Sequence, residues 1–451
     1  MHVTSGDDLL AIADRVVALA GPGEQVEAVV VRGTDTEVKA YEGEVESLAS
    51  AQSQGIGVRV VHDGRQGFAY AGTLDESVVD ETLAEARDNA SFGEVDEYFG
   101  LAEPDGVPVV ELDLYREALV AFPADRKVEL ALELERAVRA ADPRIVGIES
   151  AEYVDSVGEA AIATTTGIRS SSRDTSCYVA TYALAEQDGE VQTGFGFSVG
   201  RDPLELDVGV AAADAADRAT RLLGATKPPS ERLTVVLDPW VTAQLLGILA
   251  YTLNGEAVLK GRSLFADRLG EEVASPLITL VDDPTDPAFF TATDTDGEGL
   301  ATRRNTLIAD GVLQLFVQNA YTGRRSGTAS TGSAVRGFSS TPGVGCMATS
   351  LVPGDRSPAE LLAEVGDGLL VQDVSGLHSG VNPVSGDFST GAEGLRVRGG
   401  EVAEPVREFT IASTLQKMLK DVAAVGRDLT MLPMSAAGVT LVIHDVTVSG
   451  T

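Results

Sequence analysis

The chain has 451 residues, of which 44% are hydrophobic and 23% are charged, and its formal net charge at pH 7 is −35. These proportions exclude large-scale disorder, and the length favours two domains over a single core. The 69 acidic residues outnumber the 34 basic ones along the whole chain, so nucleic acid and anionic membrane surfaces are not expected partners.

The cysteines and the most apolar segment indicate where in the cell the protein resides. Cys177 and Cys346 lie far apart in the chain, which supports neither a disulfide framework nor a cysteine-rich metal site. The N-terminus lacks the basic stretch and uninterrupted apolar core of a signal peptide. The window Leu233–Leu253 contains Asp238 and Pro239, so it does not predict a membrane span. We expect a cytoplasmic protein.

The first part of the chain predicts a helix, three strands and a second helix. Ser5 and Asp8 form a capping pattern before apolar residues at helical spacing that end at Gly21. Strand-like runs follow at residues 26–31, 37–46 and 55–61. The second helix has an apolar face made of Val79, Leu83, Ala86 and Ala90.

An irregular connection over residues 91–120 leads to a helix, a β-rich stretch and another helix. The first of these carries apolar residues from Leu130 to Ala141 and stops before Asp142-Pro143, because a residue that precedes proline disfavours the helical conformation. β-like segments occupy about 145–199, and a helix with an apolar face extends from Val208 to Leu222. The segment Lys227–Ser230, with two prolines, is a candidate domain boundary.

We therefore predict an α+β protein with a mixed α/β domain over residues 1–226 and a β-rich domain over residues 227–451. After the boundary, Leu233–Leu237 predicts a buried strand. Asp238 and Pro239 predict a helix start, with a capping carboxylate and a proline at the first helical position. The remainder predicts short strands and Gly-rich turns, apart from one helix from Leu415 to Val425 that ends at Gly426.

Histidine, the side chain most often used for proton transfer and metal binding, occurs only at His2, His62, His378 and His444. None of the four pairs with another at ligand spacing. His62 and His444 belong to apolar strands, which favours packed or edge positions over catalysis.

One histidine is close in sequence to possible nucleophiles. His378 precedes Ser385, Asp387 and Ser389. A catalytic triad requires convergence in space, which closeness in sequence does not show. A metal-independent serine hydrolase using His378 with Ser385 or Ser389 stays open as an alternative.

Three loop segments are weaker candidates for a site. Asp294–Gly299 resembles a calcium loop but lacks the third alternate ligand and the final Glu, so it predicts a solvated turn. Asp282-Asp283-Pro284 ends a strand and predicts a turn rather than a paired-carboxylate site. Ser326–Gly345 interleaves Gly and Ser without a phosphate-binding Lys, and it predicts a surface loop that is flexible unless a ligand orders it.

Three stretches of the second domain resemble one known family. They are GRSLFADRLGEEVASPLITLVDD (261–283), DGEGLATRRNTLIADGVL (296–313), and a segment over 386–428 that begins GDFSTG and ends VGRD. All three are similar to the C-terminal domain of the TldD/PmbA family of peptidase subunits. The strands containing Glu42-Gly43-Glu44 and Gly55–Arg59 are similar to that family's N-terminal domain, so the resemblance extends over nearly the whole chain.

The resemblance also implies which branch of the family this is. In the catalytic TldD branch a His-Glu-x-x-x-His element, a further acidic residue and a C-terminal Cys are associated with zinc. Two imidazoles hold the metal, which acidifies a water, and the Glu accepts its proton. Counted back without gaps from Gly261, the His positions fall at Leu246 and Tyr251 and the Glu position at Gly247. No cysteine follows Cys346, so the resemblance implies the metal-free TldE (PmbA) branch.

The same resemblance implies a function. TldE-type chains pair with a TldD-like zinc metallopeptidase in a heterodimer that acts on peptides inside an internal cavity. We therefore expect a non-catalytic, hydrolase-associated subunit in proteolysis or peptide maturation, with no cofactor of its own and zinc in the partner. Candidates for lining the cavity are Gly386, Asp387, Phe388, Ser389 and His378, although a structural turn would explain the first four equally well. A stand-alone peptide-binding or scaffold homodimer stays open.

Overall fold

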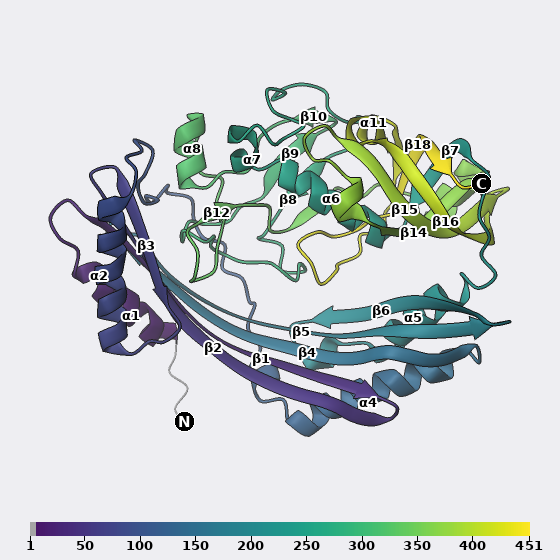
Figure 1. Ribbon diagram of the computed structural model, residues 1–451, viewed down its shortest axis with the longest axis horizontal. Helices are drawn as coiled ribbons and strands as arrows, with labels where there is room; N and C mark the ends of the chain where they lie inside the picture. Colours follow the sequence, from purple (N-terminus) through teal and green to yellow (C-terminus); the bar gives the residue numbers. More distant parts are fainter. Residues whose placement is uncertain (1–5) are drawn as a thin grey trace.

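Two β-sheets from the two halves of the chain face each other in the computed structural model, which describes residues 6–451 (Figure 1). The first is an antiparallel six-stranded sheet with the order β3-β2-β1-β4-β5-β6. Its concave face lies toward the second half of the chain. Its strands are β1 (Gln25–Tyr41), β2 (Glu44–His62), β3 (Arg65–Ala71), β4 (Ile145–Thr164), β5 (Arg169–Gln187) and β6 (Glu190–Gly200).

Helices cover the other face of this sheet. Because successive side chains point to opposite faces of a strand, Val26 and Val30 pack against the helices at one end of β1, whereas Val29 faces the second half. None of the helices within residues 6–451 combines the length and apolarity needed to cross a bilayer. The helices are α1 (Gly6–Ala18), α2 (Glu76–Phe92), α4 (Ala124–Ala141) and α5 (Val208–Thr220), with the short α3 (Glu117–Val120) and a 3₁₀ turn (Pro203–Glu205) in connections.

Strand β1 is longer than the sequence indicated. The runs predicted at 26–31 and 37–46 belong largely to this one strand of 17 residues, which a turn at Glu42-Gly43 joins to β2. The polar segment 32–35 stays extended because it pairs with β2 on one side and with β4 on the other. The capping residue predicted for the first helix, Ser5, lies outside the described residues.

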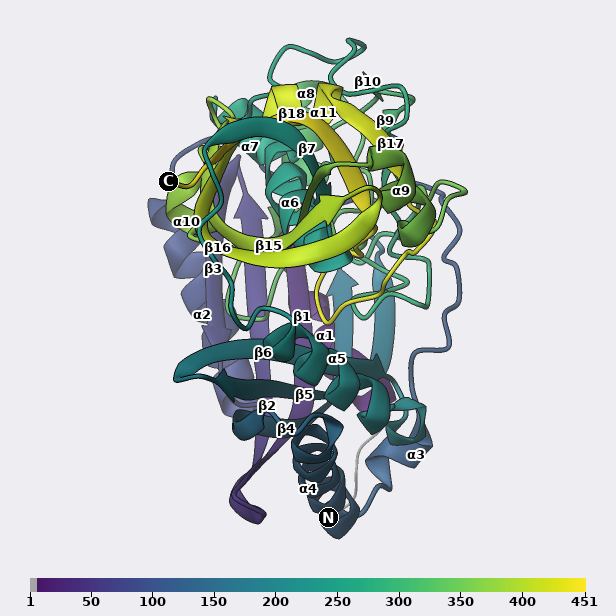
Figure 2. The same ribbon diagram turned by 90° about the vertical axis from the view of Figure 1, so that its right-hand side faces the viewer.

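The second half is β-rich, as predicted. Its main sheet has the order β16-β15-β14-β7-β18-β17, and a further pairing of β16 with β18 closes five of the strands into a ring (Figure 2). Only β14 and β7 pair in parallel within the described sheet. The strands are β7 (Glu231–Leu237), β14 (Gly368–Ser375), β15 (Asp387–Arg398), β16 (Glu401–Thr414), β17 (Val422–Val425) and β18 (Leu441–Ser449).

Smaller elements complete the second half of the chain. A four-stranded sheet has the order β10-β9-β8-β13, and β11 pairs with β12. Their bounds are β8 (Leu280–Asp282), β9 (Asn305–Ala309), β10 (Val312–Leu313), β11 (Ala334–Val335), β12 (Gly343–Val344) and β13 (Thr349–Leu351). The helices of this half are α6 (Pro239–Thr252), α7 (Gly255–Leu259), α8 (Ala320–Ser326), α9 (Pro358–Val365), α10 (Leu377–Gly380) and α11 (Leu415–Lys420).

The predicted start of α6 is confirmed. The carboxylate of Asp238 accepts hydrogen bonds from the backbone N–H groups of Trp240 at 2.7 Å and Val241 at 3.4 Å, and Pro239 occupies the first helical position. The helix then buries Leu246 and Leu249 in the largest core of the molecule.

The helix predicted from Leu415 to Val425 is wrong in its second half. It ends at Lys420, and Val422–Val425 form β17, which pairs with β18. Valine and alanine at helical spacing fit a strand equally well, and here the exposed backbone of β18 supplies the hydrogen bonds that decide between the two. The predicted boundary Lys227–Ser230 lies between α5 and β7, and the division into two domains at that point stays a prediction.

Candidate functional site

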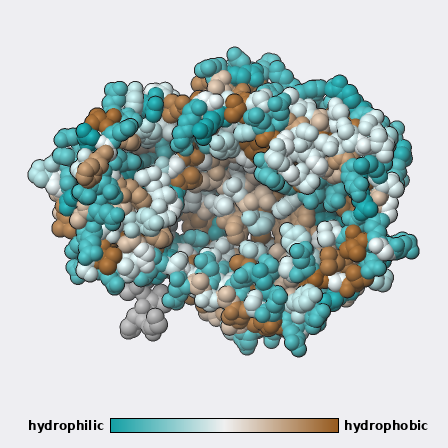
Figure 3. Space-filling model, in the orientation of Figure 1, coloured by the Kyte–Doolittle hydropathy of each residue, from teal (hydrophilic) through white to brown (hydrophobic). Residues whose placement is uncertain are grey.

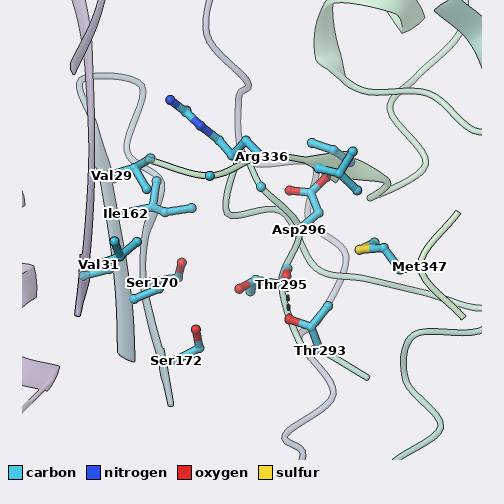
Figure 4. A pocket seen from close by; sticks show the side chains of 16 residues that line it. Val29, Val31, Ile162, Ser170, Ser172, Thr293, Thr295, Asp296, Arg336 and Met347 are labelled. Carbon is cyan, nitrogen blue, oxygen red and sulfur yellow. Dashed lines mark hydrogen bonds between the residues drawn. The ribbon is translucent and has the colours of Figure 1, made fainter. Parts of the chain in front are cut away.

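A cavity of about 290 Å³ lies between the first sheet and the loops of the second half. It opens into the hollow at the centre of the molecule, whose floor carries apolar and weakly polar residues (Figure 3). Side chains that line it are drawn in Figure 4. From the sheet come Val29, Val31, Ala160, Ala161, Ile162, Ser170 and Ser172, and from the second half come Thr293, Thr295, Asp296, Gly297, Ala334, Val335, Arg336, Gly337 and Met347.

The sheet forms one wall of the cavity with every second side chain along its strands. Val29 and Val31 are two residues apart on β1, and so are Ser170 and Ser172 on β5. Ile162 of β4 pairs with Val29 on one side and with Ser170 on the other, so these side chains share one face of the sheet. Most of the lining side chains are small, and several of the polar ones are uncharged hydroxyls. Such a surface accommodates an extended chain through backbone contacts and small side chains, and it offers few charges that would select one ligand.

A buried network of four charges lies beside this cavity and joins the two halves. Arg59 of β2 donates to both carboxylate oxygens of Glu27 on β1, at 3.0 and 2.7 Å, and to Glu298 of the second half at 3.3 Å. Arg336 donates to Glu27 from the other side. All four side chains are at most 3% exposed. Burial acts to raise the pKa of Glu27, but the two arginines outweigh it and lower that pKa.

The acidic loop predicted to be a solvated turn is buried. Asp296 is 4% exposed and Glu298 is fully buried. The carboxylate of Asp296 accepts hydrogen bonds from the backbone N–H groups of Glu298, Leu300 and Ala334 at 2.9, 3.0 and 3.0 Å. Burial, helped by the neighbouring Glu298, raises the pKa of Asp296 to about 7. The prediction of a turn was correct, but one of the three N–H groups that donate to Asp296 belongs to Ala334, which is distant in the sequence.

The segment Ser326–Gly345 is not the flexible surface loop predicted from its composition. It includes β11 and β12, and Phe338 packs on β2 where two glycines leave room. A Cβ atom on Gly55 would lie 2.3 Å from the ring of Phe338, and one on Gly57 would lie 2.1 Å from its carbonyl oxygen. The glycines of this strand therefore permit the close approach of the second half of the chain.

Asp282 is a second buried carboxylate near the cavity. It ends β8 as predicted, and the chain then turns at Asp283–Asp286. One oxygen of Asp282 accepts from the backbone N–H groups of Met347 and Ala348 at 2.8 and 2.6 Å. Burial raises its pKa to about 6, because these two hydrogen bonds offset only part of the desolvation. Its hydrogen bonds anchor the loop that carries Met347.

The structure does not assemble the predicted His–Ser–Asp group. His378, Ser385 and Ser389 are exposed around α10 and the start of β15, and none of them lines the cavity of Figure 4. Ser385 donates to Asp387 at 2.7 Å, but over residues 6–451 no hydrogen bond joins His378 to either serine. Gly386 has a φ of +84°, and Phe388 is 4% exposed in the core, so both have structural roles here. Their contribution to a substrate cavity stays a prediction.

The positions matched to the zinc motif lie on α6 and face different directions. Leu246 is 1% exposed in the core, whereas Gly247 and Tyr251 are exposed on the outside of the helix. Leucine and glycine side chains offer no electron pair, so these three residues do not fit a catalytic zinc ion. In the described part of the chain, no group of three or more His, Cys, Asp and Glu side chains could hold a metal ion.

Two of the remaining histidines lie at the end of β2 and at an irregularity in the pairing of β18 with β7. The Nδ1 atom of His62 lies 3.1 Å from the carbonyl oxygen of Gly23, and Nδ1 of His444 lies 2.9 Å from the hydroxyl of Thr234. Both imidazoles are exposed, as the edge interpretation predicted. His2 lies outside the described residues.

The buried charge network was not predicted from the sequence. Its signal was present in the sequence, because Glu27 and Arg59 are the single charges inside the apolar strand segments VEAVVV and GVRVV. Isolated opposite charges in two neighbouring apolar strands indicate a buried pair. Nothing in the local sequence indicates that Glu298 and Arg336 complete it.

Comparisons with known proteins agree along the chain. Family models described as PmbA/TldA metallopeptidase domain 1, central domain and C-terminal domain match residues 26–90, 118–223 and 230–450. The metalloprotease PmbA of Escherichia coli O157:H7 is 27% identical over 423 residues, which cover 93% of this chain and 91% of that protein. A metalloprotease TldD homolog of Haemophilus influenzae is 26% identical over 426 residues, covering 88% and 87%. The solved structure of TldE from Thermococcus kodakarensis has the same fold, with a TM-score of 0.89, 24% identity, and coverage of 99% and 100%.

Proposed function

Because the chain belongs to the PmbA/TldD metallopeptidase family, we propose that it is a TldE-like, non-catalytic subunit that pairs with a TldD-like zinc peptidase. The observation that carries the proposal is the chemistry of α6. Where the zinc-binding branch would present two imidazoles and a carboxylate, this helix presents Leu246, Tyr251 and Gly247. The chain keeps the fold of a peptidase family without side chains that could hold its metal.

The cavity supports a role in holding the peptide substrate. Its lining consists largely of small side chains and hydroxyls, and its volume of about 290 Å³ is near the lower end for binding sites. In this proposal the chain contributes one wall of a chamber in which the partner's zinc cleaves or matures the peptide. The two free cysteines support a cytoplasmic location for the complex.

The edge of β2 supports docking of another chain. Residues 44–54 are exposed throughout, including Val45 at 42% and Leu48 at 48%. The neighbouring β3 pairs only with residues 56–62, so within the described structure no strand covers the outer edge of 44–55. An uncovered edge of this length pairs readily with a strand from a partner or a peptide.

Two other functions are less well supported. Within residues 6–451 no hydrogen bond joins His378 to Ser385 or Ser389, so a serine hydrolase has no geometric support; Ser385 donates to Asp387 instead. A homodimeric scaffold could use the β2 edge equally well, and it would form without any zinc-binding partner.

The proposal is tested by mixing the purified chain with a TldD-like chain from the same organism that carries His-Glu-x-x-x-His. We expect a stable complex, stoichiometric zinc only in the partner, and peptide cleavage that appears on mixing and is abolished by a zinc chelator. His378→Ala in this chain separates the proposal from the serine-hydrolase alternative and should lower cleavage only modestly. Cleavage by this chain alone, or tightly bound zinc in it at about one ion per chain, would overturn the proposal.

A further inference from the structure

A second cavity, of about 210 Å³, lies between the end of β6 and residues 287–290 of the second half. It shares no lining residue with the cavity of Figure 4. Arg116, Arg201 and Glu205 supply its charged side chains. Pro287 and Ala288 at its rim are exposed, so a solute can reach it from solvent. Its volume is below the usual range of ligand pockets, which suits a small molecule or the end of a chain.

Thr175 of β5 positions both arginines of this cavity. It is fully buried, and its hydroxyl oxygen accepts a hydrogen bond from the backbone N–H of Arg116 at 3.0 Å. Its carbonyl oxygen accepts one from Nη1 of Arg201 at 3.1 Å. Arg201 follows the last residue of β6, and its Nη2 donates to the carbonyl oxygens of Phe289 and Phe290 at 2.8 and 3.4 Å. The Arg201 guanidinium therefore lies between the first sheet and the second half.

Arg201 is a buried cation without an ion pair within residues 6–451. It is 8% exposed, and the acceptors of its three side-chain hydrogen bonds are all neutral carbonyl oxygens. A guanidinium has five N–H donors, so these bonds leave N–H groups for a ligand. Buried charges are ordinarily paired, because an isolated charge in the interior is strongly unfavourable. The cavity therefore lacks a counter-ion at its most buried charge.

Two carboxylates act on Arg201 without pairing with it. Oε2 of Glu205 accepts from the backbone N–H groups of Arg201 and Asp202 at 2.8 and 3.3 Å, in the capping box of the 3₁₀ turn. Asp174 does not line the cavity, and burial raises its pKa, which favours its neutral form. Burial, helped by Arg116, lowers the pKa of Arg201, although Asp174 and Glu205 act in the other direction.

The lining as a whole carries an excess of positive charge. Arg116 pairs with Asp113 at 2.8 Å, but the Asp113 side chain is 85% exposed, so this pair contributes little. Two guanidinium groups thus face the single carboxylate of Glu205, in a chain whose net charge is −35. Apolar side chains, among them Val199 and Pro287, complete the lining. Such a cavity favours an anion that has an apolar part.

We propose that this cavity binds a carboxylate group attached to an apolar body, as in the C-terminal residue of a peptide or a small aromatic acid. The carboxylate would accept from the free N–H groups of Arg201, with Arg116 nearer the mouth, because a guanidinium matches a carboxylate in geometry. The apolar body would lie against Val199 and Pro287. Capture of a C-terminal carboxylate is a recurring mode of peptide recognition. The ligand would also tie the end of β6 to residues 287–290.

The experiment measures binding to the full chain by calorimetry. The probes are a short acetylated alanine peptide that ends in phenylalanine, the same peptide with a C-terminal amide, and N-acetylphenylalanine. We expect saturable binding of the free acid, and binding of the amide that is at least about tenfold weaker because the amide forms no charge-assisted hydrogen bonds. Tighter binding of the peptide acid than of N-acetylphenylalanine would identify a chain end as the ligand, and equal affinities would identify a small acid.

Two variants locate the binding without altering the buried arginine. Arg116→Gln removes one guanidinium, and Ala288→Glu adds a carboxylate at the exposed rim. Each should weaken binding of the acid several-fold and leave the weak binding of the amide unchanged. Arg126→Gln is the matched control, because Arg126 is 59% exposed on α4 and should bind the acid like the wild type.

Three results would overturn the proposal. They are equal affinities for the acid and the amide, no saturable binding at millimolar concentrations, and an affinity for the acid that neither Arg116→Gln nor Ala288→Glu changes. The measurements use this chain alone and require no cleavage, so their outcome is independent of the proposed function.

Discussion

Two of the contacts between the two halves of the molecule differ in their chemistry. The first, called here the charged contact, is the buried network of Glu27, Arg59, Glu298 and Arg336. The second, the aromatic contact, consists of Trp240 against Phe195 and Phe197, with ring centroids 4.5 and 6.1 Å apart. The Arg218–Asp238 ion pair at 2.8 Å lies beside it, and the Arg218 guanidinium lies 4.6 Å from the ring of Phe195.

The difference lies in how each contact responds to an imperfect fit. A buried ion network is stable only when every partner is in place, since an unpaired charge in the interior is strongly unfavourable. Aromatic rings gain free energy from buried area and tolerate small shifts. The charged contact therefore fixes the position of the loop that borders the cavity of Figure 4. The aromatic contact holds the two halves together mainly through buried apolar area.

Arg59→Met should have the largest effect because it leaves Glu298 without an opposite charge and Glu27 with one arginine fewer. We expect a loss of about 3–5 kcal/mol in the free energy of unfolding, measured by urea denaturation. Arg126→Met is the control, because Arg126 is 59% exposed and its pair with Glu129 should contribute less than about 1 kcal/mol. If the two variants were equally stable, the charged contact would not hold the halves together.

A second variant sharpens this result. Adding Glu298→Gln to Arg59→Met removes the charge that the first substitution leaves unpaired. The double variant should be less destabilised than the sum of the two single variants, because both residues belong to one network.

Trp240→Ala should have a smaller effect than Arg59→Met. The ring is only partly buried, so the loss should be about 2–3 kcal/mol, below the range for a fully buried aromatic side chain. Phe92→Ala, at a position 82% exposed, should change stability by less than about 0.5 kcal/mol. Thermal melts followed by circular dichroism would compare them, and a larger loss for Trp240→Ala than for Arg59→Met would reverse the ranking of the contacts.

Asp238→Ala tests the cap of α6 and its ion pair together. Loss of the cap should cost on the order of 1 kcal/mol, measured as a lower melting temperature. Asp238→Asn should recover most of this loss because an asparagine side chain also caps a helix, although it cannot pair with Arg218 as an ion. An unchanged melting temperature for the alanine variant would argue against the cap.

The smallest expected effect is a change of stability with pH at Asp296, which lies next to the charged contact. The pKa of Asp296 in the folded chain, about 7, lies above its unfolded value, so the folded chain keeps a proton that the unfolded chain has lost. This contribution to stability is complete below about pH 4 and is lost as the pH rises through about 7. The unfolding free energy of wild type relative to that of Asp296→Asn should therefore fall between pH 5 and pH 8. A difference independent of pH would show that Asp296 is ionised throughout.

Local patterns were enough to predict several elements. The cap at Asp238, the apolar face of α2 and the end of α4 before Asp142-Pro143 follow from residues within one or two turns of each other. The family resemblance predicted the mixed first half and the β-rich second half. These predictions succeeded because capping and periodicity depend on neighbours in the sequence.

Segments whose conformation depends on distant partners were predicted less well. Val422–Val425 became a strand because β18 lies beside it, and the Gly- and Ser-containing loop 326–345 is ordered by its contact with β2. Composition cannot distinguish a flexible loop from one that packs on a glycine-lined strand. In both cases the conformation is decided by hydrogen bonds or contacts with residues that are not neighbours in the sequence.

The sequence by itself determined the family, most helices and the capping of α6. Only the tertiary structure decided where charges are buried. Arg59 meets Glu298 across 239 residues, and Arg336 meets Glu27 across 309. Whether a charged side chain is solvated or buried depends on what the folded chain places over it, and that information is absent from its local sequence.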